Sequence, residues 1–195
     1  MKKNKYRVVL ILGLNCGKKV YNFIDSISEV EIISVYALHP NLSKNIAGFL
    51  DFGKFTNPKI FSYYNKLEDI EKKIISDKKI DLIVALGISS ILGKKLLNIP
   101  KYGCLGGHAA KLPERPGSAP VVWAILDNLK VTEMTIFRMS EKIDEGPIYG
   151  NIKIPIKRNM NAGDLRSKMD DVLLKLMKKH FLDIISGKNR GKIIM

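Results

Sequence analysis

The chain has 195 residues, 46% of them hydrophobic, and its 33 Lys and Arg against 19 Asp and Glu give a net charge of +14. This size and apolar content suit one α/β domain and leave no room for a second large one. The lysines are spread along the chain without the Arg-rich, aromatic-interleaved stripe that follows a nucleic-acid strand, so nucleic acid is not an expected partner.

The chain begins with Met-Lys-Lys before an apolar run at residues 8–14, which imitates a secretory signal peptide. The run is only about seven residues long and has no small-residue cleavage pattern, so a first β-strand is favoured. No stretch approaches the apolar length of a membrane span, and no membrane partner is expected. Cys16 and Cys104 lack CxxC spacing and a nearby histidine cluster, which predicts reduced cysteines, a cytoplasmic protein and no metal site.

Apolar strands alternate with amphipathic helices along the whole chain. The predicted strand at 81–86 is continuously apolar after Asp81, as expected of a parallel strand that is buried on both faces, while Leu67, Ile70 and Ile74 recur at helical spacing. This alternation predicts the α/β class, with a mostly parallel sheet and helices on both faces. The predicted strands are 6–14, 31–38, 60–63, 81–86, 102–106, 133–139 and 148–156, and the predicted helices are 18–28, 42–50, 66–78, 92–97, 118–128 and 162–187.

The turn after the first predicted strand contains Gly13 and Gly17, a spacing that invites comparison with a nucleotide-binding loop. The third glycine of the dinucleotide pattern is absent, and so is the Gly-Lys-Ser/Thr of a P-loop. The two glycines therefore do not identify a nucleotide site.

A histidine and an aspartate each follow a predicted strand. The strand at 102–106 ends in Gly106 and Gly107, and His108 comes next, beside residues that let a ligand approach the main chain. Asp144 stands in the loop after the strand at 133–139. Either residue alone has an ordinary structural explanation, since an Asp before a Gly is usually a turn residue. Together they indicate a ligand site at one edge of the sheet.

Around this pair the sequence resembles the formyltransferase family, which includes methionyl-tRNA formyltransferase, glycinamide ribonucleotide formyltransferase and the sugar-nucleotide N-formyltransferases. The resemblance implies one Rossmann-like formyltransferase domain over residues 1–195, without the C-terminal barrel that helps methionyl-tRNA formyltransferases bind tRNA. The matching residues are His108, Leu112-Pro113, Gly117, Ala119-Pro120, Trp123-Ala124-Ile125, Thr135 and Asp144-x-Gly146-x-Ile148.

The resemblance implies transfer of a formyl group from formyl-tetrahydrofolate to a primary amine. His108 would stabilise the oxyanion or shuttle the amine's proton, and Asp144 would orient the imidazole. Gly106 stands where the family has an Asn whose amide helps hold the oxyanion. Backbone N–H groups at the two consecutive glycines are the simplest substitute for that donor. We expect the position of the amide itself to hold water or a polar group from another segment, such as Ser118 or Ser89, in a slow but active enzyme.

The resemblance also implies the binding residues. The family grips the pterin of the folate largely with backbone groups of the loop that is here 87–92. The expected acceptor site departs from the family pattern, because Lys111 stands at a usually apolar position and Pro116 separates the arginine from the glycine. The implied cofactor-binding residues are Gly87, Ser89, Ser90, Leu92, Met139 and Ile143, and the implied acceptor-binding residues are Lys111, Arg115 and Gly107.

The leading hypothesis is an N-formyltransferase for a small amine, an amino sugar carried on a nucleotide. It rests on the missing tRNA barrel and on the missing glycine-rich phosphate loop of the ribonucleotide enzymes. One alternative is a catalytically degenerate folate- or nucleotide-binding relative. The missing Asn side chain at Gly106 allows this alternative, whereas the presence of both His108 and Asp144 argues against it. Another alternative is an amino-acid or peptide N-formyltransferase. The sequence leaves a homodimer open.

Overall fold

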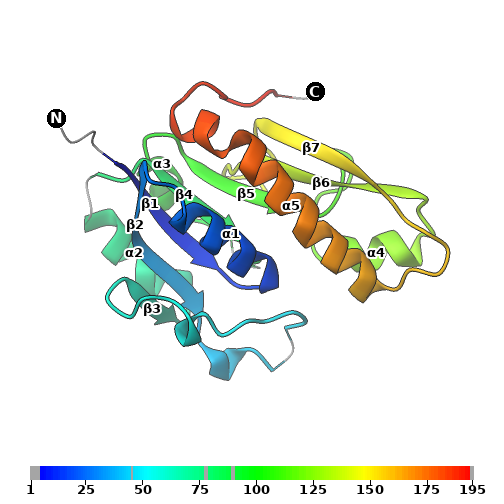
Figure 1. Ribbon diagram of the computed structural model, residues 1–195, viewed down its shortest axis with the longest axis horizontal. Helices are drawn as coiled ribbons and strands as arrows, with labels where there is room; N and C mark the ends of the chain where they lie inside the picture. The colour runs from blue at the N-terminus through cyan, green and yellow to red at the C-terminus, as the bar shows by residue number, and fades with distance from the viewer. Residues whose placement is uncertain (1–4, 45, 77–78, 89–90, 194–195) are drawn as a thin grey trace. The chain divides into compact units, whose positions relative to one another are not determined.

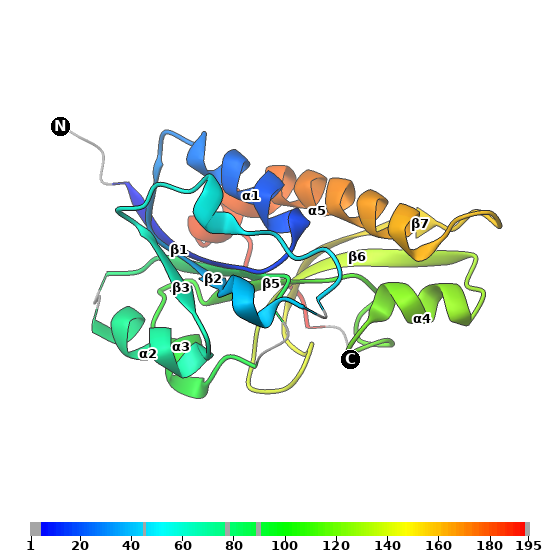
Figure 2. The ribbon, with the colours of Figure 1, turned by 90° about the horizontal axis from the view of Figure 1, so that it is seen from below.

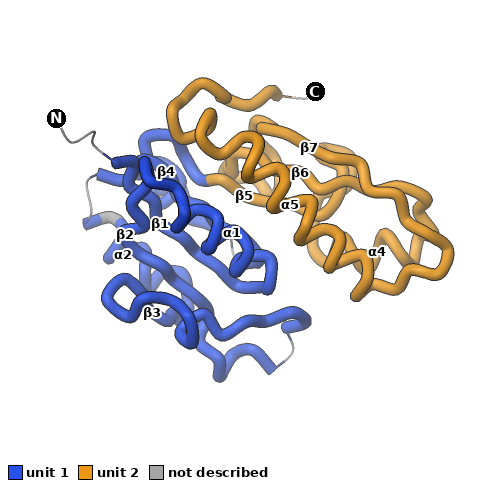
Figure 3. The backbone as a smooth tube through the Cα atoms, viewed as in Figure 1, with its two compact units in different colours: residues 1–104 blue, residues 105–195 orange. Residues whose placement is uncertain are grey.

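The computed structural model describes residues 5–44, 46–76, 79–88 and 91–193. Figure 1 shows its helices and strands coloured along the chain. The chain divides into two compact units, Met1–Cys104 and Leu105–Met195 (Figure 3). A single domain over the whole chain stays a prediction, and the two units are described in turn.

The first unit is built on a parallel sheet. All of β4 and the run from Val8 to Leu12 in β1 are buried, as strands must be when helices cover both faces of a sheet. Figure 2 shows α1 on one face and α2 and α3 on the other. The strands follow the order β3 (Phe61–Tyr64), β2 (Val30–Leu38), β1 (Tyr6–Leu12) and β4 (Leu82–Leu86), and the helices are α1 (Asn15–Asp25), α2 (Leu67–Ser76) and α3 (Lys94–Asn98).

The helix predicted at 42–50 is wrong, because the described part of this region contains two short 3₁₀ helices instead. These are η1 (Pro40–Leu42) and η2 (Phe52–Lys54). The side chain of Asp51 accepts the N–H of Gly53 at 3.1 Å, and His39 caps η1 in the same way. Such local side-chain to backbone hydrogen bonds compete with the α-helical pattern.

The second unit contains an antiparallel sheet. It consists of β5 (Cys104–His108), β6 (Val131–Arg138) and β7 (Ile148–Pro155), and β5 pairs with β6 from Leu105–Arg138 to His108–Thr135. A short loop without a helix joins β6 to β7, and such a connection can only form an antiparallel pair. The predicted strand at 102–106 lies two residues too early, so His108 is the last residue of the strand. The α/β class is confirmed.

The helix predicted at 118–128 begins two residues later and ends two residues earlier than expected. The helix α4 (Pro120–Leu126) begins at a proline, whose fixed φ suits the first helical position. Ala119 precedes it in a left-handed conformation, with φ of 53°, and no side chain caps the helix. The backbone turn at Ala119 therefore sets the start of α4.

The second unit ends in the long helix α5 (Ala162–Ile185), which contacts β6 and β7. Asn161 and Asp164 form a reciprocal capping box that satisfies the first backbone donors of the helix. Among the helices of the described residues, none combines the length and apolar character needed to cross a bilayer. One face of α5 buries Leu165, Met169, Val172, Leu173, Leu176, Met177, Phe181, Ile184 and Ile185.

His180 on α5 should make the stability of this unit pH-dependent. Its ring lies against β7, where a Cβ on Gly150 would stand 2.7 Å from Nε2. Burial, and then the charge of Lys179, lower the pKa of His180 below the usual 6.5. The unfolded chain therefore takes up this proton first, and the free energy of unfolding falls as pH decreases below about 6.5.

We expect His180→Gln to flatten this dependence. The measurement is the urea midpoint of wild type and variant at about pH 7.5 and about pH 5.5. From the higher to the lower pH, the wild type should lose more stability than the variant. Equal losses would show that the proton uptake of His180 does not differ between the folded and unfolded states.

Candidate active site

The imidazole of His108 is held at the end of β5. The residue is 6% exposed and lies opposite Thr135 of β6. Thr135 is fully buried and donates its hydroxyl to the carbonyl of Ala110 at 2.8 Å. This hydrogen bond fixes the chain two residues after the histidine, so strand pairing and the Thr135 bond together position the ring.

Both ring nitrogens of His108 face oxygen atoms. Nδ1 lies 3.4 Å from Oδ2 of Asp144, and Nε2 lies 2.8 Å from the carbonyl oxygen of Arg115. A neutral imidazole has one N–H and one lone pair, so it can donate to only one of these oxygens. The structure thus brings the predicted pair together, with a backbone carbonyl on the far side of the ring.

Asp144 is held by an unusual backbone in the loop between β6 and β7. Its φ is 50°, in the left-handed region, and its Oδ2 accepts the N–H of Gly117 at 2.8 Å. Gly146, with φ of 137°, follows, and a Cβ there would overlap the carbonyl oxygen of Arg138. The glycine lets the loop fold back against the end of β6, which presents the carboxylate to the histidine.

The side chains nearest to Gly106 are apolar, and a polar substitute for the family amide stays a prediction. Gly106 is buried in β5, two residues before His108. A Cβ on it would stand 2.9 Å from Cγ of Met139 and 3.2 Å from the Phe137 ring. Ser118 is exposed, and Ser89 lies outside the described residues. Met139 and Phe137 thus surround the position from which an amide would extend.

The expected cofactor-binding residues fall in both units. Gly87 follows β4 with φ of 64°, and Leu92 is buried, at 2% exposed. Ser89 and Ser90 lie outside the described residues. In the second unit, Met139 is half-buried and Ile143 is 57% exposed.

Gly13 and Gly87 lie in close contact, and each position requires a residue without a Cβ. A Cβ on Gly13 would overlap the Gly87 carbonyl oxygen, and a Cβ on Gly87 would stand 2.7 Å from Cγ of Leu14. The two glycines allow the ends of β1 and β4 to approach closely. The glycine spacing after the first strand therefore has a packing cause, in line with the absence of a nucleotide-loop pattern.

The family model described as formyl transferase matches residues 9–180 of the chain. The chain belongs to the formyl transferase family. It is 40% identical over 122 residues to the methionyl-tRNA formyltransferase of Bacillus velezensis, a match that covers 63% of this chain and 38% of that protein. The chain therefore spans under two-fifths of the length of this curated relative.

Solved structures agree with the fold of this formyl transferase. A sugar N-formyltransferase from Shewanella sp. matches with a TM-score of 0.75 and 21% identity, over 97% of this chain and 73% of that one. The sugar 3N-formyl transferase WlaRD, solved with dTDP and 5-N-formyl-THF, matches with a TM-score of 0.74 and 17% identity, over 98% of this chain and 67% of that one. The α/β fold of the family is thus established for this chain.

Two of the three expected acceptor-binding residues form ion pairs with acidic side chains. Exposed Lys111 pairs with Glu114 at 2.5 Å, and this hydrogen bond raises the pKa of the lysine. Arg115 Nη1 lies 2.7 Å from Oδ2 of Asp127 and lines a pocket of about 300 Å³. Gly107 lies within β5 opposite Ile136. Among the three, Arg115 is the residue that lines this pocket.

The sequence did not predict the roles that three residues have in this site. Gly117 donates to Asp144, Thr135 fixes the turn after His108, and Asp127 pairs with Arg115. Gly117 and Thr135 were visible only as matching positions of the family pattern. Asp127 carried no sequence signal, because its partner is twelve residues away on another segment.

Gly106→Asn tests whether the family amide could act in this formyl transferase. We expect the variant to lose about 1–3 kcal/mol of stability from overpacking, with transfer no faster than wild type, because Met139 and Phe137 must move. Adding Met139→Ala makes room for the amide, so the double variant should turn over faster than Met139→Ala alone. The checks are thermal midpoints and transfer rates. Faster transfer by Gly106→Asn alone, at an unchanged midpoint, would contradict the steric account.

Proposed function

We propose that this formyl transferase moves a formyl group from formyl-tetrahydrofolate to the primary amine of a small acceptor, an amino sugar carried on a nucleotide. The contact between His108 and Asp144 carries this proposal. An imidazole held beside a carboxylate, at the end of a strand in a formyl transferase fold, suits proton transfer during acylation of an amine.

The residues expected to hold formyl-tetrahydrofolate fit a flat, partly apolar ring. Ile143 and Met139 offer apolar side chains next to Asp144, one of them largely exposed. Gly87 belongs to the expected pterin loop, and its lack of a Cβ lets it pack against Leu14. When bound, formyl-tetrahydrofolate supplies the activated formyl group, and the solved WlaRD structure holds a related formyl-folate.

The proposed chemistry centres on the two nitrogens of His108. We assign Nδ1–H to the carboxylate of Asp144, which leaves the lone pair of Nε2 to accept a proton from the attacking amine. His108 can then return that proton to the departing nitrogen as the carbon–nitrogen bond breaks. In the structure the carbonyl of Arg115 lies against Nε2, so this carbonyl must move aside during turnover.

An amino sugar on a nucleotide is the acceptor that the comparisons favour among small amines. Both sugar N-formyltransferase structures match 97% or more of this chain, and WlaRD is a sugar 3N-formyl transferase solved with dTDP. The packing role of Gly13 argues against a phosphate loop like that of the ribonucleotide enzymes. The net charge of +14 would attract the phosphates of the acceptor.

Methionyl-tRNA is a second candidate acceptor. The Bacillus velezensis and Bacillus subtilis methionyl-tRNA formyltransferases share 40% and 39% identity with the matched parts of this chain, well above the 17–21% of the sugar enzymes. The same positive charge would also attract a tRNA. A direct comparison of the two acceptors decides between them.

Incubation with formyl-tetrahydrofolate and a set of amines, followed by mass spectrometry, tests the proposal. The set contains dTDP-linked 3-amino and 4-amino hexoses, methionyl-tRNA, methionine and a short peptide. We expect a formyl adduct on an amino-sugar nucleotide. Preferred formylation of methionyl-tRNA, methionine or the peptide would replace the proposed acceptor. Folate binding without formylation of any amine would favour a degenerate relative.

The cytoplasm is the location we propose for this activity. Cys16 and Cys104 are both buried thiols, as is usual where the environment keeps thiols reduced. A homodimer remains part of the proposal, and light scattering at working concentration measures it.

A further inference from the structure

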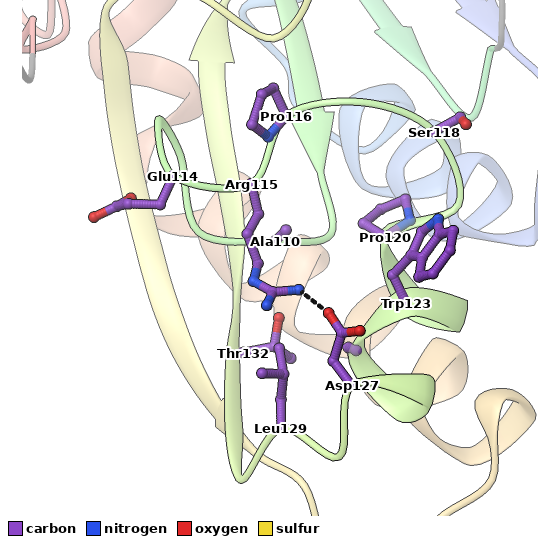
Figure 4. Close-up of a pocket in the computed structure, with 11 residues that line it drawn as sticks. Ala110, Glu114, Arg115, Pro116, Ser118, Pro120, Trp123, Asp127, Leu129 and Thr132 are labelled. Carbon is purple, nitrogen blue, oxygen red and sulfur yellow. Dashed lines mark hydrogen bonds and ion pairs between the residues drawn. The ribbon is translucent and has the colours of Figure 1, made fainter.

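We propose that the pocket between α4, the loop before it and the start of β6 binds the sugar ring of the acceptor. This inference rests on the proposed function, because it assigns the acceptor of that reaction to a place. The pocket lies wholly within the second unit and holds about 300 Å³ (Figure 4). That volume stands at the lower end of the range for small-molecule sites, roughly 300–1,000 Å³.

One wall of the pocket is an unpartnered aromatic ring. Trp123 of α4 is 55% exposed, and Figure 4 shows its indole beside Pro120 at the edge of the cavity. Among the described residues, no aromatic or cationic side chain stacks on it. An exposed indole offers a flat apolar face and one N–H donor, which suits the C–H face of a sugar ring.

The rest of the lining carries both hydrogen-bond donors and hydrogen-bond acceptors. Arg115 donates to Asp127 at 2.7 Å, and their side chains are 43% and 39% exposed. Figure 4 shows the Thr132 hydroxyl directed toward the Arg115 side chain. Thr132 is 5% exposed, and it lines the pocket beside the ion pair. Its hydroxyl can both donate to and accept from a ligand group.

The balance of charge favours hydroxyl groups over an anion. An anion at Arg115 would have to displace the Asp127 carboxylate or accept its repulsion. Sugar hydroxyls both donate and accept, so they can bond to Asp127, Arg115 and Thr132 at once without breaking the ion pair. A polyhydroxylated ring therefore fits the pocket better than a phosphate does.

The pocket shares one residue with the candidate catalytic histidine. The side chain of Arg115 lines the pocket, while its carbonyl oxygen lies 2.8 Å from Nε2 of His108. A ligand that shifts Arg115 would therefore change the group that faces Nε2. Arg115 therefore links occupation of the pocket to the surroundings of the candidate catalytic nitrogen.

Trp123 is the single tryptophan of the chain, so its fluorescence reports on the pocket directly. We expect a dTDP-linked 4-amino hexose to change the emission of the full chain in a saturable way, and dTDP alone to leave it unchanged. An equal response to dTDP alone would assign the pocket to the nucleotide and overturn the sugar assignment.

Variants separate binding from chemistry. Trp123→Ala should raise the KM for the amino-sugar nucleotide about tenfold, with kcat little changed, and Thr132→Val should raise KM less. Leu126→Ala is the matched control, because Leu126 is 63% exposed on the same helix and does not line the pocket. Thermal midpoints exclude loss of folding as the cause.

Ligand binding at Trp123 and formyl transfer are separate readouts, so the pocket assignment and the proposed function can be contradicted independently. Formyl transfer to the amino sugar, with unchanged emission and an unchanged KM in Trp123→Ala, would overturn the pocket assignment and leave the proposed function standing. A saturable change in emission without transfer to any amine would support the pocket and overturn the proposed function. Absence of both signals would overturn both.

Discussion

His108→Ala should lose formyl transfer by a factor of about 10²–10⁴, the usual contribution of a positioned acid–base group. The ring is the group that faces Asp144 through Nδ1 and the Arg115 carbonyl through Nε2. Without it, neither the proton of the amine nor the charge on the formyl oxygen has a partner at this position. The measurement is the initial rate of transfer at saturating substrates.

Stability must be followed in the same experiment, since His108 is buried. Removing the buried ring takes the Nδ1–H donor away from Asp144, which should cost about 1–3 kcal/mol. His108→Gln keeps a hydrogen-bond donor of similar size and should fold better while remaining inactive. His180→Gln serves as the control, because His180 lies on α5 against Gly150 and contacts neither His108 nor Asp144 in any of the described hydrogen bonds. Near-normal turnover in folded His108→Gln would remove the histidine from the chemistry.

Asp144→Asn should reduce transfer by on the order of a hundredfold, with little loss of stability. Asparagine tolerates the left-handed backbone at this position, and its oxygen can still accept the N–H of Gly117. Only the negative charge next to Nδ1 is lost. The transfer rate and the urea midpoint together measure the two effects.

Asp144→Ala provides the comparison. It removes the acceptor of the Gly117 N–H and puts a residue that disfavours positive φ at 50°, so it should also cost about 1–3 kcal/mol of stability. Equal activity of Asp144→Asn and wild type would show that the carboxylate acts only by hydrogen bonding to the loop.

The sequence predicts most of the fold because its signals are local. The continuous apolar run at Leu82–Leu86 requires cover on both faces, and that strand lies in a parallel sheet with helices on either side. The start of α4 was missed because it depends on the left-handed turn at Ala119. An alanine gives no signal for that conformation, whereas a nearby serine suggests a cap.

The candidate site was predicted in part for the same reason. Glycines stand beside His108 and after Asp144, and glycines often mark strand ends and turns. This pattern allowed both residues to be placed at one edge of a sheet. The contacts of Arg115 could not be predicted, because both its carbonyl and its side chain meet partners distant in sequence. The apolar space beside Gly106 depends on where the side chains of β6 point, which a single glycine does not reveal.

The central claim is that His108 and Asp144 act as one unit, and a double-mutant cycle tests it most directly. Transfer rates are measured for His108→Gln, Asp144→Asn and the combined variant, with the amine that the acceptor assay identifies. Groups that act together are strongly non-additive, so the combined variant should be no slower than His108→Gln alone. Losses that multiply in the combined variant would show that the two residues act independently and would contradict this account.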